Sequence, residues 1–122
     1  MSNEKFYVKL IGIVFDPSQK KILIGKNNGD KNYSFIDGEL SYNEELSECL
    51  KKITKEKTGY DTVNLGSIFA GLRKKEELTI YFLCEIKDGK AKPGNKVKEI
   101  KWVKAKEIEN LINEKLPNKL WE

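Results

Sequence analysis

The chain has 122 residues and a mass of 14.1 kDa, which is room for one domain of ordinary size. A hydrophobic content of 39% excludes a disordered tail, and charged residues make up a further 34%. The longest apolar run, 10–15, is far too short to cross a membrane. We therefore expect a single domain over 1–122, located in the cytoplasm because its first residues do not resemble a signal peptide.

The residue types limit the chemistry that is available. There is no histidine, which excludes Ser-His and Cys-His nucleophile pairs. The net charge is +4, Arg73 is the only arginine, and lysines alternate with acidic residues, as is typical of a solvated surface and not of a nucleic-acid stripe. Cys49 and Cys84 lie far apart in the sequence, and we expect both to be reduced and buried.

The first third of the chain predicts extended structure. β-branched and aromatic residues over 6–15 predict a strand, and the turn at Asp16-Pro17-Ser18 leads into a partner strand at 21–24. A hairpin over 6–25 follows from this pattern. After a polar loop, 33–40 is a further short extended piece.

An amphipathic helix is predicted next, from position 42 to position 58. Its apolar residues recur with helical spacing: Leu46, Cys49, Leu50 and Ile53. Ser41 and Glu44 fit a capping box at its start, and Gly59 fits a left-handed C-cap at its end.

The second half predicts three more strands and a last helix. The strands are expected at 63–72, 78–86 and 97–103, with a charged hairpin tip at 73–77. In 78–86, alternate residues from Leu78 to Ile86 share one face. A second amphipathic helix is expected over 106–116. The order predicts an α+β domain, with a mixed β-sheet sandwiched between helices.

The stretch from 35 to 60 resembles the box of the Nudix family, G-x5-E-x7-R-E-U-x-E-E-x-G-U, in which U is aliphatic. Four residues stand at matching positions: Gly38, Glu44, Glu56 and Gly59. Lys52 replaces the box arginine, whereas Ile53 and Lys57 replace two of its glutamates. Since the strands and helices around the box also resemble the family pattern, the resemblance implies the Nudix fold.

Nudix hydrolases cleave a nucleoside diphosphate linked to a further moiety, and glutamates of the box hold the Mg²⁺ that neutralises the diphosphate. The resemblance therefore implies Glu56 and Glu44 as catalytic residues, Glu56 and Gly38 as the metal site, and magnesium as cofactor only if the chain is active. Ile53, Glu56 and Lys57 together carry no net formal charge where the family has three negative charges. One carboxylate beside an ammonium is a poor magnesium site.

We therefore expect standard hydrolysis to be lost or weak. The chain would bind a nucleoside-diphosphate-type ligand, or act as an interaction or regulatory module. Lys57 would contact phosphate, with Gly38 and Lys52 beside the ligand. Tyr33, Phe35 or Tyr81 would stack on a base. The alternative is an active, Mg-dependent pyrophosphohydrolase of nucleoside diphosphate derivatives with a non-standard ligand set.

Each of these residues also has a purely structural interpretation. Glu44 would serve as a capping residue, Ile53 and the strand aromatics would belong to the core, and the glycines would serve the backbone. The expected partner is a nucleotide or another diphosphate small molecule. A homodimer and an RNA or protein partner stay open, and no membrane partner is expected.

Overall fold

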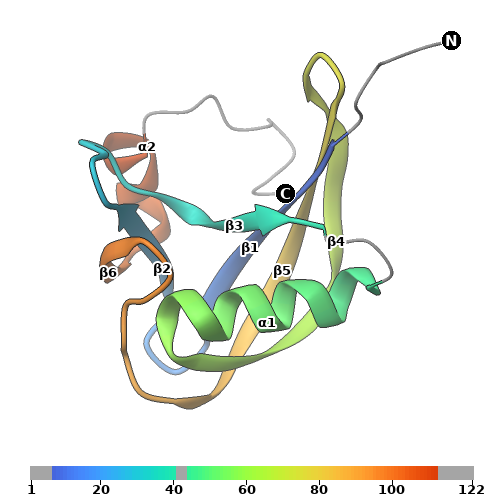
Figure 1. The fold of residues 1–122 in the computed structure, drawn as a ribbon. Helices are drawn as coiled ribbons and strands as arrows, with labels where there is room; N and C mark the ends of the chain where they lie inside the picture. The colour runs from blue at the N-terminus through green and yellow to red at the C-terminus, as the bar shows by residue number, and fades with distance from the viewer. Residues whose placement is uncertain (1–6, 41–43, 113–122) are drawn as a thin grey trace, which may run out of the picture.

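The computed structural model describes residues 7–40 and 44–112 (Figure 1). These residues form six strands, one long helix, a 3-10 turn and a short last helix. In chain order the elements are β1 (Tyr7–Asp16), β2 (Lys21–Asn27), β3 (Ser34–Glu39), α1 (Leu46–Thr58), β4 (Tyr60–Lys74), β5 (Glu77–Gly89), β6 (Val97–Val103), η1 (Ala105–Glu107) and α2 (Ile108–Leu111).

The six strands make one mixed sheet in the order β4-β5-β1-β3-β2-β6. β1 and β5 run parallel, and every other pairing is antiparallel. β1 pairs with β3 along its first half and with β2 beyond it, where Val14 lies opposite Leu23. The predicted hairpin between the first two strands and the mixed sheet are therefore confirmed.

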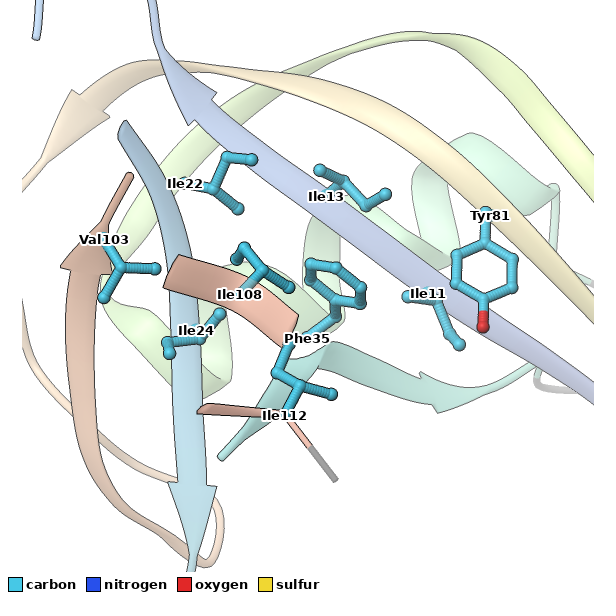
Figure 2. Close-up of a cluster of buried hydrophobic side chains, with 9 residues drawn as sticks. All are labelled: Ile11, Ile13, Ile22, Ile24, Phe35, Tyr81, Val103, Ile108 and Ile112. Carbon is cyan, nitrogen blue, oxygen red and sulfur yellow. The ribbon is translucent and has the colours of Figure 1, made fainter. Parts of the chain in front are cut away.

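Apolar side chains cover both faces of this sheet, because residues alternate between the faces along each strand. On one face they pack against α2 in a cluster (Figure 2) of Ile11, Ile13, Ile22, Ile24, Phe35, Tyr81, Val103, Ile108 and Ile112. On the other face they pack against α1 in a cluster of Leu10, Val14, Leu23, Ile36, Cys49, Leu50, Phe82 and Cys84. The sheet thus lies between two helices, as the sequence predicts.

The two cysteines belong to the cluster under α1. Both are free and buried, which confirms the prediction that they serve as small core residues. Burial raises the pKa of the Cys84 thiol to about 11. The thiol is therefore protonated at neutral pH, and it contributes packing rather than reactivity.

The start of α1 corrects the capping prediction. The helix begins at Leu46, and its N-cap is Glu45, which makes no side-chain capping hydrogen bond. Glu44 precedes the helix and cannot occupy the third helical position of a capping box, so that assignment is wrong. Ser41 lies outside the described residues. The end of α1 is as predicted, because Gly59 adopts φ 82° and its N–H donates to the Lys55 carbonyl at 2.9 Å.

The last predicted helix, 106–116, is shorter within the described residues. η1 and α2 occupy 105–111, and Ile112 leaves the helix to form a bridge with Tyr33. Positions 113–116 of the prediction lie outside the described residues. In the part of the chain that the structure describes, no helix has the length and apolar character to span a membrane.

Candidate functional site

The contact between α1 and β3 brings two positions of the box together. Gly38 lies on β3, and a Cβ built on it would come within 2.6 Å of the Ile53 Cδ1 atom. A side chain at position 38 would force the Ile53 side chain to shift, so glycine allows this close approach. Ile53 is half-buried here and packs on the edge of the core cluster under α1. The structure therefore fills the space beside Gly38 with an aliphatic side chain.

Lys57 lies one helical turn after Ile53 and also reaches β3. Its Nζ donates to the backbone carbonyl of Asp37, and it lies 3.5 Å from Asp37 Oδ1. Lys9 of β1 approaches the other carboxylate oxygen, with Nζ 3.3 Å from Oδ2. The Lys57 side chain is only 16% exposed. We call Lys9, Asp37 and Lys57 the lysine–aspartate cluster.

Two ammonium groups share one carboxylate in the lysine–aspartate cluster, so the cluster carries one net positive formal charge. Such a charge attracts anions, and hydrogen bonds from an ammonium to phosphate oxygens are stronger than neutral ones. A divalent cation, in contrast, is repelled by the same two ammonium groups.

A cavity of about 260 Å³ opens beside this cluster. Lys9, Asp37 and Ser34 form part of its wall, and residues 30–33 of the loop between β2 and β3 form the rest. Its lining is polar and includes Lys31 and Ser34, which can donate hydrogen bonds. The cavity is of a size that suits a phosphate or diphosphate group and not a complete dinucleotide.

Glu56 does not join this group. Its side chain is exposed, and Oε2 lies 3.5 Å from the Asn95 Nδ2 atom. It borders a separate hollow lined by the end of α1 and by residues 90–94 of the loop before β6. The predicted pairing of Glu56 with Gly38 in one metal site therefore finds no support in the geometry, because the two residues face different surroundings.

Glu44 and Lys52 meet on the outer surface of α1. Glu44 Oε1 lies 3.9 Å from Lys52 Nζ, and the Lys52 side chain is 64% exposed. An exposed ion pair of this length contributes at most about 1 kcal/mol. The structure thus places these two predicted site residues together, but away from the lysine–aspartate cluster.

Phe35 is unsuited to the role that the sequence suggests. Its ring is 2% exposed, and it packs edge-on against Tyr81 with ring centroids 6.5 Å apart (Figure 2). A nucleotide base cannot stack on a ring that is enclosed in the core, so the ligand-binding assignment of Phe35 is wrong. Tyr81 is buried in the same cluster, with 1% exposed. Phe35 and Tyr81 are therefore core residues, which is the structural interpretation of the strand aromatics.

Tyr33 remains the aromatic residue nearest the cavity, whose wall it joins. The Nζ atoms of Lys26 and Lys101 lie 4.6 Å and 5.6 Å from the centre of its ring. Burial raises the pKa of Tyr33, and the hydrogen bond and charge of Glu99 raise it further. Two ammonium groups thus lie against the Tyr33 ring, although neither lysine belongs to the cavity wall.

The residues present do not fit a magnesium ion held in the way that the Nudix box implies. Magnesium requires several oxygen ligands in octahedral geometry. The positions that face β3 hold Ile53 and Lys57, and Glu56 lies elsewhere. Across the described residues there is no group of three or more His, Cys, Asp or Glu side chains placed to hold a metal.

Sequence reasoning missed the roles of two residues. Asp37 stands directly before the matching Gly38 and therefore outside the box, so its position carries no sequence signal. Lys9 carried no signal, because its nearness to Asp37 depends on the pairing of β1 with β3, where Ile11 lies opposite Asp37. Only the strand register brings the Lys9 side chain to Asp37.

Comparisons with known proteins agree with this fold. A sequence family described as the NUDIX domain matches residues 7–121. A search of curated proteins finds no significant match.

Solved structures of similar fold are numerous. A NUDIX hydrolase from Nitrosomonas europaea has a TM-score of 0.80 and 18% identity, covering 93% of this chain and 66% of its own. An ADP-ribose pyrophosphatase from Streptococcus suis 89-1591 has a TM-score of 0.69 and 16% identity, covering 79% of this chain and 72% of its own. A NUDIX-family hydrolase from Clostridium perfringens has a TM-score of 0.75 and 14% identity, covering 92% and 90%. The chain spans just under two thirds of the Nitrosomonas protein, and identities this low establish the fold alone.

Proposed function

The chain belongs to the Nudix family, and from this premise we propose that it binds a nucleoside-diphosphate-type anion without standard Nudix hydrolysis. The observation that carries the proposal is the position of Lys57. A cation stands where the family pattern has the last glutamate of the box, and it contacts the Asp37 carbonyl and carboxylate. A resident ammonium disfavours Mg²⁺ and favours phosphate at the same place.

The polar cavity beside the lysine–aspartate cluster supports the binding half of this proposal. A diphosphate entering it would meet Lys9 from β1 and Lys31 from the loop, with Lys57 behind Asp37. In the proposed orientation of the nucleotide, its phosphates contact the lysines, and its sugar or base points toward Tyr33 and solvent. In the cell, such a module would sense or sequester a nucleotide in the cytoplasm as a single domain over 1–122.

The second candidate is an active, magnesium-dependent pyrophosphohydrolase with a non-standard ligand set. Solved structures of similar fold include an ADP-ribose pyrophosphatase and a UDP-X diphosphatase. In this reading Glu56 and Glu44 would supply the carboxylates. Because Glu44 pairs with Lys52 and Glu56 lies near Asn95, the two do not meet at one point, and the geometry favours the first candidate.

A binding titration with ADP-ribose in EDTA tests the proposal. We expect binding without metal, measured by isothermal titration calorimetry. Lys57→Met should weaken it about tenfold or more, because the Asp37 carboxylate on the cavity wall would keep only one of its two ammonium partners and would then repel the phosphate. Lys51→Met is the matched control, since Lys51 is an exposed lysine of the same helix.

Two results would contradict the proposal. One is the absence of any ADP-ribose binding in EDTA. The other is hydrolysis of ADP-ribose with Mg²⁺ at an ordinary enzymatic rate, about 1 s⁻¹ or faster, which would favour the second candidate.

A further inference from the structure

The cavity beside the lysine–aspartate cluster holds two carboxylates that differ in their surroundings. Asp37 lies between two ammonium groups, those of Lys9 and Lys57. Asp30, on the same cavity wall, takes part in no ion pair among residues 7–40 and 44–112. A carboxylate without a cation beside it repels phosphate and accepts hydrogen bonds. The wall thus attracts an anion at one point and requires a hydrogen-bond donor at another.

The fold sets the backbone position of Asp30 before a ligand arrives. Its N–H donates to the Asn27 carbonyl at 3.1 Å, which closes a turn. Gly29 adopts φ 86° inside this turn, a conformation that glycine allows at little cost. The turn is also tied to the segment before β6, because the Asn28 N–H donates to the Lys96 carbonyl at 2.8 Å. A group that is already in place loses less conformational entropy on binding.

The size of the cavity decides which part of a nucleotide reaches Asp30. Its volume of about 260 Å³ is below the range of about 300–1,000 Å³ that is typical of pockets enclosing a whole small-molecule ligand. When the phosphates lie against Lys9 and Lys31, the group bonded directly to them is the ribose, and the base lies beyond it. We therefore expect the ribose, and not the base, to lie against the loop that carries Asp30.

A ribose supplies the donors that Asp30 lacks. The 2′- and 3′-hydroxyls of a ribose are adjacent and each donates one hydrogen bond, and a carboxylate has two oxygens that accept. An ionised acceptor makes stronger hydrogen bonds than a neutral one. Acidic residues bind ribose hydroxyls in this way in dinucleotide-binding enzymes. The chemistry of Asp30 therefore matches the sugar of a ribonucleotide.

We propose that Asp30 accepts hydrogen bonds from the ribose hydroxyls of the bound nucleotide, so that the site selects ribonucleoside diphosphates over their deoxy forms and over free diphosphate. This inference rests on the proposed function, because it requires the phosphates to lie in the same cavity. Asp37, in contrast, is held by two ammonium groups and has no part in selecting the sugar. A base amino group is the other donor in a nucleotide, and removing only the hydroxyls distinguishes the two.

Isothermal titration calorimetry in EDTA tests the proposal, with ADP, 2′,3′-dideoxy-ADP and inorganic diphosphate as probes. The wild type should bind dideoxy-ADP about tenfold or more weakly than ADP, because two hydrogen bonds to a charged acceptor are lost. Asp30→Ala should bring the affinities for the two nucleotides within about twofold of each other, and it should bind inorganic diphosphate more tightly, since a repelling carboxylate is gone. Asp88→Ala removes the same charge from an exposed position on β5, outside the cavity wall, and should keep the wild-type ratio.

The outcomes separate the role of Asp30 from the proposed function. If the wild type binds ADP and dideoxy-ADP equally well, or if Asp30→Ala keeps the wild-type ratio, the role of Asp30 is overturned while diphosphate binding stands. If neither ADP nor inorganic diphosphate binds to the wild type in EDTA, the proposed function fails and the role of Asp30 fails with it. Asp30 is exposed, so Asp30→Ala should melt within about 3 °C of the wild type. The comparison of the two nucleotides on the wild type needs no variant.

Discussion

Two neighbouring residues of α1 face different surroundings. Lys57 turns toward β3 and contacts Asp37, with a side chain that is only 16% exposed. Glu56 turns toward the loop before β6, where its Oε2 atom lies 3.5 Å from Asn95 Nδ2. Adjacent residues of a helix point about 100° apart, because 3.6 residues complete a turn. The two sides of one helix therefore belong to two different places on the molecule.

The comparison teaches which part of a motif match carries information. Glu56 agrees with the family pattern and yet lies away from Gly38. Ile53 and Lys57 disagree with the pattern and yet contact β3. The two residues that differ from the family pattern therefore lie where α1 meets the sheet. Their effect on the site beside Gly38 is larger than that of the retained glutamate, Glu56, which lies elsewhere.

The largest expected effect comes from restoring both departures, with Ile53→Glu and Lys57→Glu in one variant. Together with Asp37, the side of α1 that faces β3 would then offer three carboxylates. We expect Mg²⁺ to raise the melting temperature of this variant, because a bound ion stabilises the folded state by mass action. We also expect Mg-dependent hydrolysis of ADP-ribose at least about 100-fold above the wild type.

Lys51→Glu is the control for this restoration, because it adds negative charge on the exposed side of the same helix. Neither its melting temperature nor its hydrolysis should respond to Mg²⁺. If the double variant also shows no response, the loss of two glutamates does not by itself explain a loss of hydrolysis.

A smaller effect is expected from Lys57→Met measured as stability. The variant removes a donor from the Asp37 carbonyl and leaves the carboxylate with Lys9 alone. We expect the free energy of unfolding in urea to fall by about 1–2 kcal/mol. Lys51→Met should change it by less than about 0.5 kcal/mol. If both variants lost the same free energy of unfolding, the contact of Lys57 with Asp37 would contribute no more to stability than an exposed lysine of the same helix.

The smallest effect is expected from Glu56→Gln. Since its carboxylate is exposed and has one long contact, the free energy of unfolding should change by less than about 0.5 kcal/mol. The affinity for ADP-ribose, measured by calorimetry, should stay within twofold of the wild type. A loss of affinity or of residual hydrolysis in Glu56→Gln would instead support the alternative enzyme.

Much of the fold follows from local sequence patterns. The alternation of apolar residues predicts the strands, and the helical spacing from Leu46 to Ile53 predicts α1. The start of α1 could not be predicted as well, since Glu44 has the spacing of a capping residue but Glu45 occupies the N-cap position, without a side-chain capping hydrogen bond. The role of Phe35 depended on tertiary packing, because a strand aromatic has the same local pattern whether it faces the core or a ligand.

The sequence by itself determined the family, the α+β class and the substitution of two box glutamates by Ile53 and Lys57, since these depend on residue identity and spacing along the chain. Only the tertiary structure decided what the substitutions contact. The pairing of β1 with β3 brings Lys9 to Asp37, and the packing of α1 on β3 brings Lys57 to the same carboxylate. Both are contacts between residues distant in sequence, and their geometry depends on register and packing that no local pattern encodes.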